Sequence, residues 1–168
     1  MRLEPLYRAR FTTPERWSVE LNGPHGTETQ SLLFAHGRCE GRVEGTLRAT
    51  NFPRRRSDGA LTPDFRGVVE TSDGATILFS WHGYALPAVD RVRRLVGALT
   101  HVSDDERYAW LNIVVCTVAG AVEQRPDGNG TDVVIDVAEL MWQPIAASQS
   151  DRASSAAISR TGTDRAAF

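Results

Sequence analysis

Residues 107–118 read RYAWLNIVVCTV. β-Branched and aromatic residues fill this segment and neither Gly nor Pro interrupts it, which predicts a central β-strand. Alternate side chains of a strand point to opposite faces. One face would carry Ala109, Leu111, Ile113, Val115 and Thr117, and the other Tyr108, Trp110, Asn112, Val114 and Cys116. Because both faces are mostly apolar and one ends in an aromatic and amide cluster, the segment is typical of the wall of a closed barrel that holds a ligand.

Further segments on both sides of this one also have the composition or the alternation of strands. We predict strands at 3–11, 17–21, 31–36, 41–50, 64–71, 76–84 and 132–142. Residues 64–71 and 76–84 flank Ser72, Asp73 and Gly74, a strong signal for a β-hairpin. Glycines inside 41–50 indicate bends, which are common where a sheet curls into a barrel.

One segment, 86–99, predicts an α-helix. Its apolar residues form a stripe at helical spacing, and Pro87 suits a first helical turn. The stripe consists of Val89, Val92, Leu95, Val96 and Leu99. The expected fold class is therefore all-β with one helix: an antiparallel barrel, with the helix packed on it or plugging one end.

Length and composition indicate one domain. The chain has 168 residues, 41% of them hydrophobic, and a formal net charge of −2. We expect residues 1–147 to form a single barrel domain and 148–168, which lack apolar periodicity, to be a disordered tail. The mixed charge gives no basic face for nucleic acid.

All 19 basic residues are arginine, a bias that GC-rich coding also explains. The absence of lysine excludes Schiff-base chemistry, including that of pyridoxal phosphate, and the phosphate-binding P-loop. The three arginines of Arg54–Arg56 lie in a predicted exposed loop and suit either a solvated loop or an anion site.

Cys39 and Cys116 are far apart in apolar stretches, so we expect buried free thiols. The first residues lack the apolar core of a signal peptide, and no apolar run reaches membrane-spanning length. The expectation is a cytoplasmic protein without membrane contact. Its oligomeric state is not given by the sequence, and a homo-oligomer is left open.

Several motifs, in order, carry a resemblance to a known family. They are Gly37, Glu40-Gly41, Gly45, Gly59-Ala60, Asp64-Phe65-Arg66, residues 71–77 (TSDGATI), Gly83, residues 107–112 (RYAWLN) and residues 133–137 (VVIDV). From about Leu3 to Leu140 the chain resembles an uncharacterised bacterial and fungal family of small calycin-like, allene-oxide-cyclase-like β-barrels, catalogued as a domain of unknown function. The resemblance implies a barrel with an internal pocket and supplies no reaction.

Motifs for metal, nucleophilic or dinucleotide chemistry are missing. The four histidines are isolated, without the spacing of metal ligands, and neither G-x-S-x-G nor G-x-G-x-x-G occurs. We therefore expect no metal and no cofactor.

Polar side chains on the predicted strands remain as site candidates. Asp64, Arg66 and Tyr108 are the candidate catalytic residues, because they can transfer protons or polarise a carbonyl. The candidate substrate-binding residues are Trp110, Asn112, His82, Trp81 and Glu44. Asp64 and Arg66 could pair inside the lumen or form an ion pair on the outer face. Glu44 also fits an outer-face position. Trp81 also fits a position in the hydrophobic core with no contact to a ligand.

The first hypothesis for the function is a cofactor-independent cyclase, isomerase or lyase. It would act on an apolar small molecule, natural products included, held in the barrel lumen. The alternative is a non-catalytic binding or carrier protein for a hydrophobic small molecule, and the third is a structural barrel filled by its own side chains. A binder requires a pocket, and an enzyme requires a pocket with a titratable group of perturbed pKa.

Overall fold

A computed structural model describes residues 1–126 and 130–142 of the chain. In this part, ten strands form one antiparallel sheet, and all but the two short strands β4 (Arg54–Arg55) and β5 (Leu61–Thr62) build a closed barrel. The barrel strands are β1 (Arg2–Gly23), β2 (Gly26–Gly41), β3 (Gly45–Asn51), β6 (Asp64–Thr71), β7 (Thr76–Ala85), β8 (Val92–Val102), β9 (Val115–Gln124) and β10 (Thr131–Met141). The predicted antiparallel barrel is confirmed.

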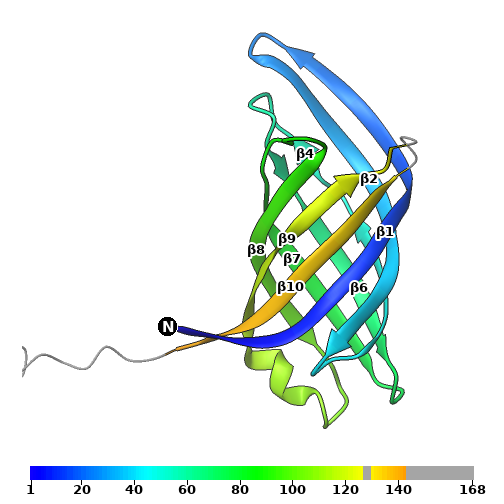
Figure 1. The fold of residues 1–168 in the computed structure, drawn as a ribbon, viewed down its shortest axis with the longest axis vertical. Helices are drawn as coiled ribbons and strands as arrows, with labels where there is room; N and C mark the ends of the chain where they lie inside the picture. Colours follow the sequence, from blue (N-terminus) through cyan, green and yellow to red (C-terminus); the bar gives the residue numbers. More distant parts are fainter. Residues whose placement is uncertain (127–129, 143–168) are drawn as a thin grey trace, which may run out of the picture.

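Closure comes from β1, which pairs with β2 on one side and with β10 on the other (Figure 1). The other barrel strands each pair with their neighbours in the chain, in up-and-down order. Closing the sheet removes the unpaired edges that would otherwise bind other strands. The short strands β4 and β5 bridge β2 and β7 at one end of the barrel.

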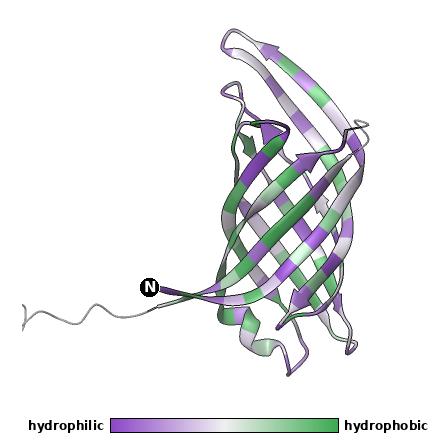
Figure 2. Ribbon diagram, in the orientation of Figure 1, coloured by the Kyte–Doolittle hydropathy of each residue, from purple (hydrophilic) through white to green (hydrophobic). Residues whose placement is uncertain are grey.

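Alternation along the strands separates the lumen from the outside, as the alternating colours of Figure 2 illustrate. On β3, for example, Gly45, Leu47, Ala49 and Asn51 are buried and the residues between them are exposed. The predicted hairpin is also confirmed: β6 and β7 pair in register and Gly74 takes a φ of +89° in the turn.

The hairpin of β1 and β2 extends past the barrel. The predicted strands 3–11 and 17–21 are parts of one strand, β1, and 31–36 belongs to β2. The outer halves of both strands rise above the barrel as a two-stranded arm, seen at the top of Figure 1. This arm stands beside the open end of the barrel.

The predicted helix at 86–99 is wrong, because this segment enters strand β8 after a tight turn. Along β8 burial has a period of two: Leu95, Leu99 and His101 are buried, whereas Val96, Ala98, Thr100 and Val102 are exposed. β8 pairs with β7 and with β9, and these hydrogen bonds outweigh the helical spacing of the valines and leucines.

The predicted strand at 107–118 is wrong in its first half. Ala109–Ile113 form a 3-10 helix, η1, and β9 begins only at Val115. η1 lies across the lower end of the barrel in Figure 1 and buries Leu111, while Ile113 is 91% exposed. A short helix therefore plugs one end, as the fold class predicted, but it is formed by a different segment.

Both cysteines are free and buried, as predicted. The predicted tail, residues 148–168, lies outside the described residues. No helix in the described part of the chain has the length and apolarity needed to cross a membrane.

Candidate binding site

A cavity of about 480 Å³ occupies the end of the barrel opposite η1. Segments far apart in the chain meet around it: the β1–β2 arm, the short strands β4 and β5, the β7–β8 turn and the ends of β9 and β10. The volume lies in the range of roughly 300–1,000 Å³ typical of small-molecule sites. The barrel is therefore filled at one end and hollow at the other.

The floor of the cavity is apolar. Phe65, Leu95 and Val133 reach it from three different strands, and Leu33, Leu61 and Val122 add to its walls. Phe65 is stacked on Trp81, with ring centroids 4.7 Å apart and an interplanar angle of 17°. This floor suits the apolar body of a ligand.

The rim of the cavity is cationic. Arg16, Arg55, Arg91 and Arg93 line it, and its described lining contains no Asp or Glu. Arg54 and Arg56, on either side of Arg55 in the chain, pair with Glu28 and Asp58. Within the described residues the four rim arginines have no such ion pair, so their charge is available to a ligand.

Arg93 is held in place at the rim by two backbone carbonyls. Its Nη1 donates to the carbonyl oxygens of Leu86 (3.1 Å) and Gly59 (3.3 Å), which fixes the guanidinium plane. Its Nε and Nη2 have no hydrogen-bond partner among residues 1–126 and 130–142. Partial burial lowers the pKa of Arg93, and the nearby positive charges of Arg55 and Arg16 lower it further. An anion bound at this guanidinium would offset both effects.

Arg91 lies in the tight turn before β8. Asp90 and Arg91 have φ values of +49° and +69°, and Val89 and Val92 exchange backbone hydrogen bonds around them. This left-handed conformation favours glycine or asparagine. The turn therefore holds an arginine at the rim at some cost in backbone energy.

Neutral donors complete the site. Asn51 is only 6% exposed; its Oδ1 accepts from the backbone N–H of Asp64 (3.0 Å), and its Nδ2 has no partner in the described chain. The Ser31 hydroxyl bonds to that of Ser18 (2.8 Å) and accepts from Arg16 (3.4 Å). Asn51 and Ser31 both line the cavity and can bind ligand oxygen atoms.

Asp64, Arg66 and His82 lie on the outside of the barrel. The prediction that they face the lumen is wrong, and the outer-face alternative holds for Asp64 and Arg66. Arg66 Nε is 3.4 Å and His82 Nδ1 is 3.6 Å from Asp64 Oδ1, in an exposed cluster. The alternation places Phe65 and Trp81 in the interior, so the residues one position away face solvent.

Tyr108, Trp110 and Asn112 lie at the plugged end and not on a lumen wall. The Asn112 amide bonds to the backbone of Ser103 in both directions (2.8 and 2.9 Å). The guanidinium of Arg42 lies over the ring of Trp110, with Arg42 Cζ 4.5 Å from the ring centroid. The cavity lining does not include these three residues.

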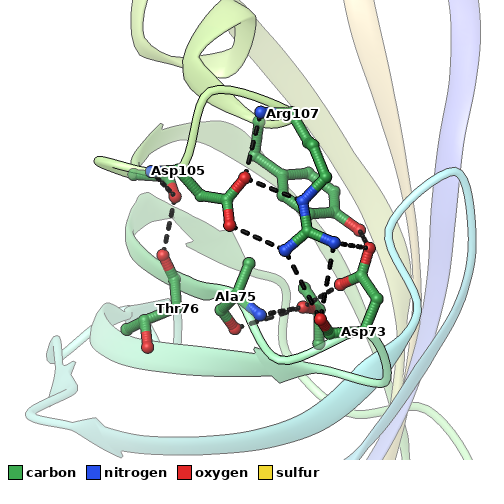
Figure 3. Close-up of polar contacts among 8 residues, drawn as sticks. Asp73, Ala75, Thr76, Asp105 and Arg107 are labelled. Atoms are coloured by element: carbon green, nitrogen blue, oxygen red, sulfur yellow. Dashed lines mark hydrogen bonds and ion pairs between the residues drawn. The ribbon is translucent and has the colours of Figure 1, made fainter.

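Tyr108 belongs to a polar latch between the β6–β7 turn and the segment before η1. Arg107 binds Asp73 and Asp105 (2.9 and 2.7 Å; Figure 3). The Tyr108 hydroxyl donates to Asp73 (3.1 Å). Hydrogen bonds from Arg107 hold the pKa of Asp105 at about 2. A bond from Thr71 and one from Tyr108 lower the pKa of Asp73.

Trp81 is interior, behind the cavity floor, and its Nε1 has no described partner. Glu44 is exposed in the β2–β3 turn, as its outer-face reading predicted. Sequence reasoning missed Arg16, Arg91, Arg93 and Asn51, and Arg55 was considered only as part of an arginine run. One signal was present, since arginine at 93 lies on the same side of its strand as Leu95 and Leu99.

Metal ligands are not gathered at this site. In the part of the chain that the structure describes, no group of three or more His, Cys, Asp or Glu side chains is placed to hold a metal ion.

A family model matches residues 1–140: the DUF3237 family, described as proteins of unknown function. A search of the curated proteins finds no match to the chain.

Solved structures share the fold. A β-barrel-like protein from Acinetobacter baumannii has 21% identity and a TM-score of 0.64, with 83% of this chain and 96% of that one covered. A conserved protein of unknown function from Rhodopseudomonas palustris has 16% identity and a TM-score of 0.65, covering 83% and 97%. An enzyme from Penicillium herquei has 21% identity and a TM-score of 0.56, covering 81% and 93%. At these identities the likeness shows the fold alone.

Proposed function

We propose, from the premise that this chain belongs to the DUF3237 family of unknown function, that its barrel binds a small organic acid in the open end of the lumen. The observation that carries the proposal is the cavity itself, with four arginines and no described acidic residue around an apolar floor. A carboxylate would lie at the rim, and the apolar body of the acid would extend towards Phe65.

Electrostatics support an anion at the rim. Several like charges beside a low-dielectric cavity repel one another, and an anion offsets that repulsion. The free Nε–Nη2 edge of Arg93 has the fork geometry that binds both oxygens of a carboxylate. Asn51 Nδ2 adds a neutral donor in the same cavity.

The floor supports an apolar body of moderate size. A cavity of about 480 Å³ accommodates a ligand with one or two rings or a short alkyl chain. Phe65, backed by Trp81, offers an aromatic face to such a ligand.

Calorimetric titration with aromatic and aliphatic carboxylates, each beside its neutral amide, tests the proposal. We expect the acids to bind about 10- to 100-fold more tightly than the amides, as for charge-assisted hydrogen bonds. Arg55→Gln and Arg93→Gln should each reduce that preference. Arg66→Gln, on the outer face, is the matched control and should bind like the parent. Equal affinity for acids and amides, or no binding by any acid, would overturn the proposal.

A second candidate is a cofactor-independent enzyme, a cyclase, isomerase or lyase acting on such an acid. It is favoured by the description of the Penicillium herquei neighbour as an enzyme. Rim arginines can stabilise an oxyanion that develops during reaction. The described lining offers no Asp, Glu, His, Cys or Tyr as a general base, so this candidate is restricted to reactions that the shape of the cavity directs.

NMR spectra of each bound acid, followed over time, separate the two candidates. An unchanged ligand supports binding alone. New resonances that depend on Arg93 support turnover.

A further inference from the structure

We infer that the outer surface of β7, β8 and β9 is the interface of a homodimer, in which two copies pack face to face about a two-fold axis crossing β8 at Leu99. The inference does not depend on the proposed function. It rests on a surface that we call the neutral face. Its members are the outward side chains of Leu78, Ser80, His82, Tyr84, Val96, Ala98, Thr100, Val102, Val115, Thr117 and Ala119.

The neutral face is continuous across three strands. In register, Leu78 pairs with Val102, and Tyr84 with Val96, which in turn pairs with Ala119. Val96 and Val102 are 52% and 60% exposed. Large exposed apolar patches usually mark an interaction site.

The opposite side of the barrel is charged. The outward residues of β1, β2, β3 and β6 include Arg8, Arg10, Arg38, Glu40, Arg48, Arg66 and Glu70. The chain therefore keeps charges off one side of a barrel whose other side is rich in them. Solubility alone would not require this division.

The outward residues of β8 form a self-complementary pattern, which is why we name a second copy as the occupant. A two-fold axis at Leu99 brings each position into contact with the position equally far on the other side of Leu99. Ala98 then faces Thr100, and Val96 faces Val102. Asp104 lies two residues past the end of β8 at Val102, so the same axis brings it towards Arg94 of the other copy, a charge pair at the rim of the contact.

The same axis gives a matched pattern on β7. Trp81 pairs with Leu99 in register, so the axis crosses β7 at Trp81. Leu78 of one copy then faces Tyr84 of the other. Nearer the axis on β7, Ser80 of one copy faces His82 of the other, so the polar pair lies at the centre and the apolar pair lies outside it.

Side-chain size also suits the contact. Barrel surfaces are convex, so two of them approach most closely at the centre and separate towards the edge. On β8 the small Ala98 and Thr100 lie beside the axis, and on β7 Ser80 and His82 do; Val96, Val102 and Tyr84 lie farther out. Arg94 and Asp104 are exposed and have no ion-pair partner within the described chain, so each is free to pair across the interface.

Sedimentation over a dilution series of the full-length protein tests the inference. The parent should be a dimer that dissociates on dilution. Ala98→Glu places two carboxylates beside the axis and should give a monomer with an unchanged circular dichroism spectrum. Two matched controls, Thr46→Glu on β3 and Val19→Glu on the β1–β2 arm, should stay dimeric.

Charge reversal tests the register of the two copies. Arg94→Asp and Asp104→Arg should each raise the dimer dissociation constant about tenfold. The double variant, which restores opposite charges, should recover parental affinity. A monomeric parent, a dimeric Ala98→Glu, assembly beyond a dimer or loss of the dimer in Val19→Glu would each overturn the inference. A double variant that stays weak would overturn the axis at Leu99.

Discussion

His101 is a titratable side chain that lies buried in the barrel, and no acidic side chain pairs with it in the described part of the chain. It is 1% exposed, and its Nε2 lies 3.0 Å from the Tyr7 hydroxyl. Its Nδ1 has no hydrogen-bond partner in the described part of the chain. Burial lowers the pKa of His101 from 6.5 to about 4, because the imidazolium form would lose its hydration.

This depressed pKa predicts acid sensitivity. Below pH 6.5 the unfolded chain binds a proton at His101 that the folded barrel does not, so stability falls as the pH falls. Between pH 7 and pH 4 the free energy of unfolding should decrease by about 3 kcal/mol from this group. Urea denaturation across that pH range measures the decrease.

His101→Phe is the control, because it keeps an aromatic ring and removes the titration. Its free energy of unfolding should vary less with pH than that of the parent. Equal pH dependence in the two proteins would show that His101 does not cause the loss of stability at low pH.

At the scale of elements, η1 closes the barrel through one side chain. Leu111 is fully buried, whereas Ile113, two residues later, is almost fully exposed. The latch of Arg107, Asp73 and Asp105 holds the segment leading into η1 against the β6–β7 turn. The apolar contact supplies stability, and the exposed latch mainly sets the position of the segment.

Leu111→Ala should therefore lower the free energy of unfolding by about 2–4 kcal/mol, because it leaves a cavity in a packed end of the barrel. Ile113→Ala should change it by less than about 0.5 kcal/mol. Urea denaturation of both variants gives the comparison. A similar loss in the two would mean that η1 does not dock through Leu111.

At the scale of the whole molecule, the closed barrel shields both thiols. Cys39 and Cys116 are buried on β2 and β9, and burial raises the pKa of each to about 11. Thiol reagents react with the thiolate, which is scarce at neutral pH at such pKa values. Opening the sheet would be needed to expose either sulfur atom.

Both thiols should thus resist a thiol-specific reagent in the native protein and react as two equivalents after denaturation. The slow native reaction should track global unfolding as urea is added. A reductant should leave the melting temperature unchanged, because both cysteines are free. Rapid native labelling of either cysteine would show that the barrel opens locally.

The sequence by itself determined the strands with clean alternation, the β6–β7 hairpin and the all-β barrel. These features depend on a period of two and on local turn chemistry, both of which are visible in a short stretch. It also determined that the cysteines are free thiols, since their positions lie far apart in apolar segments.

Tertiary structure alone decided the remainder. Residues 86–99 satisfy both helical and strand spacing, and only pairing with β7 and β9 selects the strand. Residues 107–118 have strand propensity throughout, but those before Val115 fold across the barrel end. Phe65 and Trp81 enter the core, and this decides that Asp64 faces outward, since a shift of one residue exchanges the faces of a strand. The site arises in the same way, because Arg16, Arg55, Arg91 and Arg93 meet only when the barrel closes.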